Sequence, residues 1–164
     1  ITALCRRKGS NRSLENTCGP IYRKGMEILK EYWQTLGGKK SFSLSIEGNY
    51  GYLEGDSATA AQLYAVVSAA TGIVPRAKVA VTGALGLTGE ILTVGGINEK
   101  IEGWYRAGGE GILYPAGNQK DLCLRPSVEK AVQEGRFRLW GIHHVEEGAE
   151  ILFCKKWKWL RRKI

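Results

Sequence analysis

The chain has 164 residues, with 24 lysine and arginine side chains against 16 aspartate and glutamate side chains, which gives a formal net charge of +8. This length suits one domain with a substantial core. The four cysteines form no Cys-x-x-Cys pair and no Cys/His ligand spacing, so we expect free thiols, a reducing compartment and no zinc site. The longest apolar runs are short and interrupted, so neither a membrane span nor a signal peptide is expected.

The positive charge is concentrated at the two ends of the chain. Residues 1–14 hold four basic and no acidic side chains, and residues 155–163 hold six basic and no acidic ones. The 140 residues between them hold 14 basic and 16 acidic side chains, so a basic surface across the fold, and with it a nucleic-acid partner, is not indicated. We interpret residues 1–15 as a poorly ordered basic segment, 16–153 as the domain and 154–164 as a basic tail.

Helices and strands are predicted to interleave along the domain. Helical periodicity covers 17–36 and 97–107, and a helix after Ser57 ends near Thr71, where Gly72 and Pro75 follow. Further helices are expected from Pro126 to before Gly135 and over 145–152, and strands over 41–47, 77–82, 90–94, 111–114 and 137–142. The order lacks a strict βαβ rhythm and favours an α+β fold, a mixed sheet with packed helices. The pattern alone does not exclude an open α/β sheet.

Ser57 is the first candidate for chemistry. It follows Gly55 and Asp56 and precedes an apolar run, which is typical of a loop-to-helix junction. Backbone N–H groups there lack partners and the helix macrodipole is positive, so an oxyanion formed on attack at a carbonyl would be stabilised. The alternative is that Ser57 is an ordinary N-cap.

Lys100 is the candidate base for that serine. Gly95-Gly96 brings the backbone close, and Ile97, Ile101 and Trp104 provide apolar cover at helical spacing. Burial and a helix N-terminus both disfavour an ammonium group, which lowers the pKa of a lysine toward the range where it accepts a proton. The alternative is a solvated lysine.

His143 and His144 offer a competing arrangement, because with Ser57 and Asp56 they complete the residue types of a Ser-His-Asp triad. Adjacent residues at the end of an alternating segment point to opposite faces, so at most one histidine could serve. We prefer a turn or strand-end role for both.

Four motifs, in order, resemble those of Lon proteases. Glu54-Gly55-Asp56-Ser57-Ala58 resembles the nucleophile motif of the family's membrane-anchored B branch, and Val81-Thr82-Gly83 resembles its Met-Thr-Gly. Residues 89–100 are similar to Gly-x-(Val/Ile)-Leu-Pro-(Val/Ile)-Gly-Gly-x-x-x-Lys, and residues 114–118 resemble Ile-Pro-x-x-Asn. Lys100 follows Ser57 by 43 residues, which is also the family's spacing. The resemblance covers about residues 16–153.

The resemblance implies a fold and a mechanism. The fold is the Lon proteolytic domain, an α+β arrangement related to the second domain of ribosomal protein S5. The activity is a serine endopeptidase that cleaves unfolded or damaged proteins with a dyad of Ser57 and Lys100. Thr82 would hydrogen-bond Lys100, while Asp56 and Glu54 would shape the loop and engage the lysine. A carboxylate beside Lys100 would raise its pKa, which suggests a resting arrangement that rearranges in the active state.

The resemblance also implies partners. Unfolded chains would be fed by an AAA+ ATPase module in cis, which would hold ATP and Mg²⁺, and the domains would form a homo-oligomeric ring, a hexamer in the family. The glycine-rich residues 83–89 lack a Gly-Lys-Ser/Thr end, so we expect no nucleotide, cofactor or metal in this chain. The alternative function is a catalytically silent Lon-like assembly or peptide-binding module, against which the intact Ser/Lys pair argues.

The sequence departs from the common family pattern in three places. Ala84 stands where the A branch has glutamate, Thr93 replaces a proline, and Gly103-Trp104-Tyr105 stands where small alanines are typical. The N-terminal part of a full Lon proteolytic domain and the AAA+ module are absent from these residues, so we expect one piece of a longer polypeptide.

The end of the chain combines six positive charges with Trp157 and Trp159. We interpret it as a frayed, partly helical tail whose tryptophans lie on a neighbouring surface. Its alternatives are a nucleic-acid strip and contact with a membrane surface, because cations approach anionic partners and indoles favour interfaces. We expect a cytoplasmic protein, and under the membrane alternative this tail would contact the cytoplasmic face.

Overall fold

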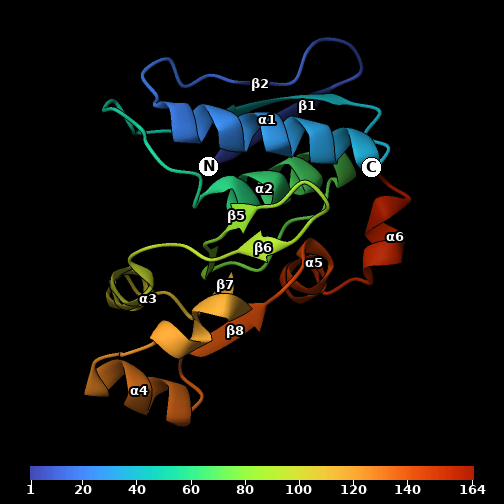
Figure 1. Ribbon diagram of the computed structural model, residues 1–164. Helices are drawn as coiled ribbons and strands as arrows, with labels where there is room; N and C mark the ends of the chain where they lie inside the picture. Colours follow the sequence, from blue (N-terminus) through green and yellow to red (C-terminus); the bar gives the residue numbers. More distant parts are fainter.

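A long helix, α1 (Pro20–Thr35), crosses the upper part of the computed structural model, which describes all 164 residues (Figure 1). Pro20 occupies the first turn, where its missing N–H costs nothing. The buried stripe of the helix includes Leu29, Tyr32 and Trp33, as its periodicity predicted. The indole Nε1 of Trp33 donates to the backbone oxygen of Lys40 at 2.9 Å, which holds the following turn against the helix.

The first sheet contains the N-terminal residues. Strand β1 (Thr2–Arg6) pairs antiparallel with β3 (Ser41–Ser45), and β2 (Arg12–Ser13) pairs parallel with the same strand. The sequence predicted poor order for residues 1–15, whereas the structure places two strands there. Ala3 and Cys5 alternate toward the core, and the remote strand β3 satisfies the backbone of both segments. That pairing partner lies more than 30 residues away, so local composition does not reveal it.

Helix α2 (Thr59–Thr71) lies at the centre of the molecule, below α1 in Figure 1. Leu63, Val66 and Val67 are fully buried, because the helix is covered on several sides. It ends at Gly72 in the left-handed conformation, which confirms the predicted end.

The second sheet is parallel throughout. Its strands are β4 (Val79–Val81), β7 (Gly111–Pro115) and β8 (Arg138–Ile142), in the order β4-β7-β8. Strands β5 (Ala84–Leu85) and β6 (Ile91–Leu92) form a separate antiparallel pair. The predicted α+β class is confirmed, with the strands divided among three small sheets and only one of them purely parallel.

Four helical segments connect and cover the second sheet. They are α3 (Ile97–Arg106), the 3₁₀ helix η1 (Ala116–Asp121), α4 (Pro126–Gln133) and α5 (Val145–Phe153). The larger hydrophobic core joins α1, β3, α2, α5 and the end of the chain, and a smaller one joins α3, β7 and α4. No helix is both long and apolar enough to span a membrane.

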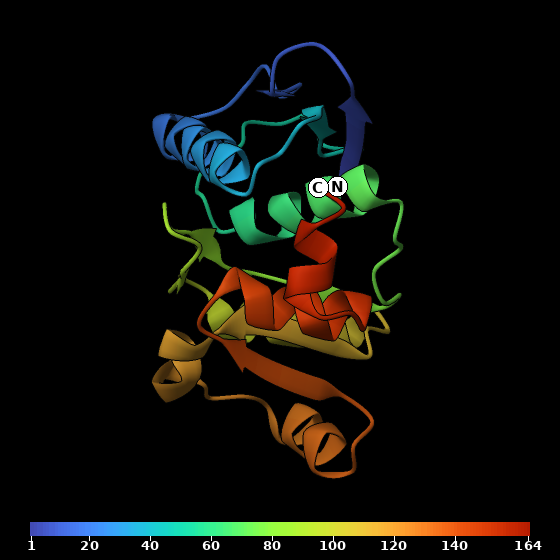
Figure 2. The ribbon, with the colours of Figure 1, turned by 90° about the vertical axis from the view of Figure 1, so that its right-hand side faces the viewer.

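The last residues form a helix, α6 (Trp157–Arg161), which packs beside α5 (Figures 1 and 2). Trp157, Leu160 and Ile164 belong to the larger core. The predicted helical character and the packing of a tryptophan on a neighbouring surface agree with this structure, but the tail is not frayed. The spacing of these three residues is helical, and the lysines and arginines between them conceal the pattern.

Candidate active site

Ser57 lies two residues before α2, at the junction that the sequence predicted. Its carbonyl oxygen accepts hydrogen bonds from the backbone N–H of Gly83 at 2.8 Å and from the hydroxyl of Thr82 at 3.3 Å. The residues after β4 therefore hold the serine backbone in place.

Helix α1 fixes the same loop from the other side. A Cβ atom on Gly25 would come within 2.8 Å of the Thr59 methyl group and 3.0 Å of the Asp56 Cβ. The hydroxyl of Thr59 donates to the backbone oxygen of Asp56 at 2.7 Å and accepts from the N–H of Leu85 at 2.8 Å. The loop before α2 is thus held by packing and by two further hydrogen bonds.

Lys100 lies in the first turn of α3. That helix starts at Gly96, whose φ of 64° is a left-handed conformation that glycine adopts at little cost. The Lys100 Nζ donates to the backbone oxygen of Gly95 at 2.8 Å. Burial lowers the pKa of Lys100, while the negative charges of Asp56 and Glu99 oppose that shift.

One open cavity of about 430 Å³ brings these residues together. Ser57, Thr82 and Lys100 all line it. Its apolar wall consists of side chains from the chain's first residue, the start of α2, β4, α3 and β7: Ile1, Ala58, Ala61, Ala80, Val81, Trp104 and Ile112. The indole Nε1 of Trp104 donates to the backbone oxygen of Gly111 at 2.9 Å, which fixes the ring at the wall. The cavity therefore joins a hydroxyl, an amine and an apolar surface.

Thr82 makes a different contact from the one predicted. Its hydroxyl donates to the Ser57 carbonyl oxygen, and the Lys100 ammonium donates to Gly95, so no Thr82–Lys100 hydrogen bond is present. Thr82 positions the serine loop in this arrangement. The backbone of β4 presents the hydroxyl to that loop because the two segments are already joined at Gly83.

The two acidic residues before Ser57 behave differently from each other. The negative charge of Asp56 favours the charged form of Lys100 and so offsets part of the lowering of its pKa by burial. The carboxylate of Glu54 instead accepts from the backbone N–H of Ile21 at 3.0 Å, from Gly55 at 3.1 Å and from the hydroxyl of Tyr52 at 3.0 Å. Desolvation raises the pKa of Glu54, but the hydrogen bonds together outweigh this effect, so the pKa lies below its ordinary value. Glu54 therefore caps the start of α1, and its predicted engagement with Lys100 is not seen.

Asn118 is a positioning residue that the sequence did not assign, although its motif was recognised. Its buried side-chain amide accepts from the N–H of Val94 at 2.9 Å and donates to the Val94 carbonyl at 3.1 Å. Val94 immediately precedes the glycines that open α3. The amide therefore fixes the segment whose Gly95 carbonyl binds Lys100.

The histidines have structural roles. The Nε2 of His144 lies 2.9 Å from the backbone oxygen of Thr88, and its Nδ1 accepts from the N–H of Glu146 at 3.5 Å, which caps α5. Neither His143 nor His144 lines the cavity that contains Ser57. The competing Ser-His-Asp arrangement therefore has no support in the geometry.

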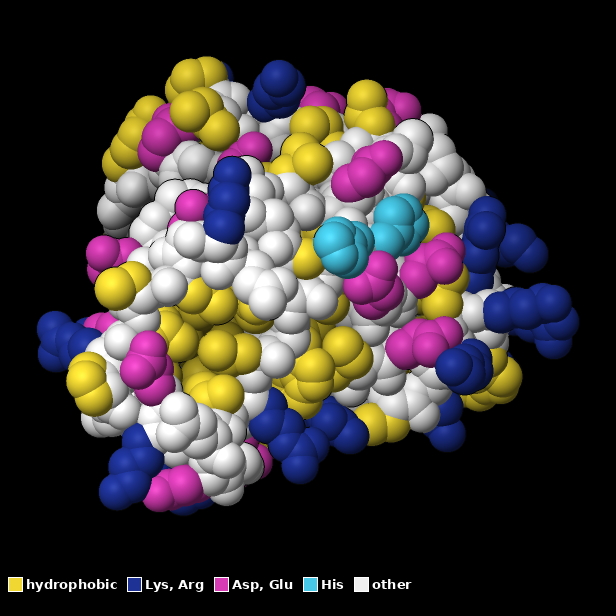
Figure 3. All heavy atoms as spheres, turned by 60° about the horizontal axis from the view of Figure 1, so that its bottom comes forward, with side chains coloured by type: hydrophobic (Ala, Val, Ile, Leu, Met, Phe, Trp, Pro, Cys, Tyr) yellow, Lys and Arg dark blue, Asp and Glu magenta, His cyan; other side chains and the backbone are white.

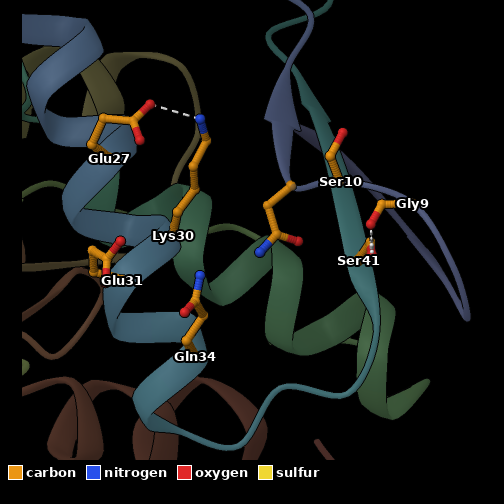
Figure 4. A pocket seen from close by; sticks show the side chains of 8 residues that line it. Gly9, Ser10, Glu27, Lys30, Glu31, Gln34 and Ser41 are labelled. Atoms are coloured by element: carbon orange, nitrogen blue, oxygen red, sulfur yellow. Dashed lines mark hydrogen bonds and ion pairs between the residues drawn. The ribbon is translucent and has the colours of Figure 1, made fainter.

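A second pocket, of about 370 Å³, also contains a serine and a lysine (Figure 4). Figure 4 shows Lys30 directed at Glu27, with an Nζ–Oε1 distance of 2.7 Å. The pocket has no apolar lining residue, and the Lys30 ammonium is paired with the Glu27 carboxylate. It offers neither a free amine nor a wall for an apolar side chain. No group of three or more His, Cys, Asp or Glu residues that could hold a metal ion occurs anywhere in the chain.

Comparison with known proteins gives concordant matches. The family model described as the Lon protease (S16) C-terminal proteolytic domain matches residues 50–154, which include Ser57 and Lys100. The chain is 33% identical to a putative Lon protease homolog of Escherichia coli (strain K12) over 151 residues, covering 85% of this chain and 26% of the relative. It is 31% identical to a putative Lon protease homolog of Haemophilus influenzae over 147 residues, covering 82% and 24%. An archaeal Lon protease of Pyrococcus abyssi is 40% identical over 106 residues, covering 65% and 11%. The chain thus spans about a quarter, or less, of the length of these curated relatives.

Proposed function

Because the chain belongs to the Lon protease family, we propose that it is a serine peptidase domain in which Ser57 and Lys100 hydrolyse peptide bonds. The observation that carries this proposal is that the two residues, 43 positions apart and at the starts of two different helices, line one cavity. Burial lowers the pKa of Lys100, as a general base requires.

In each half of the proposed reaction, Lys100 acts first as a base and then as an acid. Neutral Lys100 takes the proton from the Ser57 hydroxyl as its oxygen attacks the peptide carbonyl. The lysine then gives that proton to the departing amine, and an acyl-enzyme remains on Ser57. A water molecule then gives a proton to the same amine and attacks the acyl carbonyl. The ester bond to Ser57 breaks, the lysine returns the proton to the serine oxygen, and the carboxyl product leaves.

Backbone N–H groups would stabilise the tetrahedral oxyanion. The N–H groups of Ser57 and Ala58 donate to no acceptor within the chain. Both lie at the N-terminal end of α2, a helix of 13 residues whose macrodipole favours negative charge there. These groups are the proposed oxyanion donors.

The observed position of Lys100 represents a resting state in this proposal. An ammonium group donates to the Gly95 carbonyl, and Asp56 favours the charged form. A substrate side chain in the cavity would exclude water and lower the pKa of Lys100 further. The amine would then turn from Gly95 toward Ser57.

The cavity wall indicates the kind of side chain that is bound. Seven apolar residues line it, and the indole of Trp104 is fixed by its hydrogen bond to Gly111. An apolar substrate side chain beside the scissile bond would bury area on this wall. Unfolded polypeptides, which expose such side chains, are the proposed substrates.

The remaining parts of the proposal lie outside this stretch of chain. Because the curated relatives are more than three times as long, we propose that the peptidase works with an AAA+ ATPase module in cis and in a homo-oligomeric ring. ATP and Mg²⁺ would belong to that module. The cytoplasm, where unfolded chains and ATP meet, is the proposed location.

The test is labelling of the full 164-residue chain with a serine-reactive fluorophosphonate, with the modified residue located by mass spectrometry. Ser57 should be labelled, Ser57→Ala should abolish the label, and Lys100→Met should slow labelling roughly a hundredfold or more. The double variant His143→Ala with His144→Ala is the matched control and should retain labelling. A folded wild-type chain that takes no label at Ser57, and cleaves no unfolded protein, would instead be a silent peptide-binding module.

A further inference from the structure

The outer face of the C-terminal segment is a strongly basic surface, defined here as Lys155, Lys158, Trp159, Arg162 and Lys163. All five side chains are exposed. Figure 3, which keeps left and right as in Figure 1, shows basic side chains projecting along the margin where α6 lies. None of these four cations forms an ion pair with a carboxylate, whereas the adjacent Lys156 is paired with Glu150 at 3.1 Å. The charge of this surface is therefore not neutralised by the protein.

The surface is held rigidly. Trp157, Leu160 and Ile164, on the opposite side of the same segment, are buried in the larger core. The carboxylate of Glu150 accepts the N–H of Trp157 at 2.9 Å, and Arg161 donates to the backbone oxygen of Thr35 at 3.4 Å. The four cations are thus presented from a fixed platform, so binding an anionic partner requires little ordering of the backbone.

Trp159 identifies the kind of partner. Its indole is 41% exposed, and the Nζ atoms of Lys155 and Lys163 lie 5.7 Å and 5.5 Å from the centre of its ring. An indole contacted by two ammonium groups is a poor platform for stacking nucleic-acid bases, which need a free aromatic face. An indole surrounded by lysines does suit the headgroup region of a bilayer, where tryptophan and basic side chains are both favoured.

We propose that this basic surface binds the face of an anionic phospholipid membrane, with Trp159 at the level of the headgroups. α6 lies at the edge of the molecule in Figure 1 and faces the viewer in Figure 2, so its outer side is open to a broad planar partner. In Figure 1, α6 and α3 lie on opposite sides, so the cavity with Lys100 would face away from the membrane. Binding therefore leaves the cavity open, and it does not depend on the proposed peptidase activity.

The test measures binding of the full chain to vesicles of phosphatidylcholine, alone or mixed with phosphatidylglycerol, by sedimentation. Binding should require phosphatidylglycerol and weaken as salt is added. Each basic side chain near an anionic surface contributes roughly fivefold, so Lys158→Gln, Arg162→Gln and Lys163→Gln together should reduce binding roughly a hundredfold. The matched control replaces three exposed lysines elsewhere, Lys24, Lys120 and Lys130, with glutamine, and should bind almost as the wild type.

Tryptophan fluorescence provides the second readout. The vesicle-induced blue shift should be present in the wild type and absent in Trp159→Phe, although four other tryptophans remain. Point variants are used because removal of the whole segment would expose the core. Equal binding to neutral vesicles, equal losses in the two triple variants, or binding of single-stranded DNA without binding of anionic vesicles would each overturn the proposal.

Discussion

Lys100 sets the pH dependence of the proposed reaction. Burial lowers its pKa, and only the neutral amine can act as a base. Activity should therefore rise with pH, with a midpoint below the ~10.4 of an ordinary lysine. The measurement is the rate of Ser57 labelling across the neutral to alkaline range. A rate that does not change with pH would argue against a lysine base.

The same lowered pKa predicts an effect on stability. The folded state disfavours the ammonium form, so below the folded-state pKa the charge on Lys100 destabilises the protein. This penalty disappears as pH rises through the interval between the folded and unfolded pKa values. Lys100→Met should therefore have a higher Tm than the wild type at neutral pH, and the two Tm values should converge as pH rises. A constant difference across pH would show that packing, rather than charge, is responsible.

Asn118 should affect both stability and reactivity. Asn118→Ala removes both hydrogen bonds to the Val94 backbone and leaves those partly buried groups unpaired, which should cost about 1–3 kcal/mol of unfolding free energy. The segment that holds Lys100 would also lose its anchor, so Ser57 labelling should slow at pH values where the protein is fully folded.

Asn98→Ala is the matched control for that variant. Asn98 also makes two hydrogen bonds to backbone groups, at Asp121 and Cys123, but not to the segment before α3. Its loss should reduce stability without slowing the labelling. Equal labelling rates in the two variants would show that Asn118 contributes to stability but does not position Lys100.

Among the helices and strands, those marked by local sequence signals were predicted well. Those that depend on a partner far along the chain were not predicted. Helices α1, α2 and α3 are periodic and end at Gly or near Pro, and each was predicted within a few residues. Strands β1 and β2 depend on pairing with β3, and α6 depends on the core beneath it. Those partners lie far along the chain, so composition alone suggested disorder at both ends.

Helix α6 should be necessary for stability. Trp157 is buried, and Trp157→Ala would leave a cavity that costs about 3–5 kcal/mol of unfolding free energy. Its Nε1 has no hydrogen-bond partner, so Trp157→Phe loses no hydrogen bond and should cost less than about 1.5 kcal/mol. Denaturant unfolding measures both. This packing differs from the frayed tail that the sequence suggested, so removal of residues after Phe153 should unfold the protein. A truncated chain as stable as the wild type would contradict the packing seen here.

Across the whole molecule, the site forms where the two hydrophobic cores meet. Ser57 precedes a helix of the larger core, and Lys100 begins a helix of the smaller one. The motifs led us to expect these residues in one site, and both line the same cavity. The partners of Thr82 and Glu54 could not be predicted, because they depend on which backbone groups β4 and α1 bring near: Ser57 for the hydroxyl, Ile21 for the carboxylate.

A ligand that spans this junction should stabilise the entire fold. A peptide boronate with an apolar side chain next to the boron would bond to Ser57 and bury that side chain on the wall that includes Trp104. Binding only to the folded state adds about 2.7 kcal/mol at a hundred times Kd, so the Tm of the wild type should rise by several degrees. Ser57→Ala removes the bond to boron and should show little shift, and a boronate with an acidic side chain should shift the wild type less. Equal shifts in wild type and Ser57→Ala would place the ligand elsewhere, and equal shifts for the two boronates would mean that the apolar wall does not select the side chain.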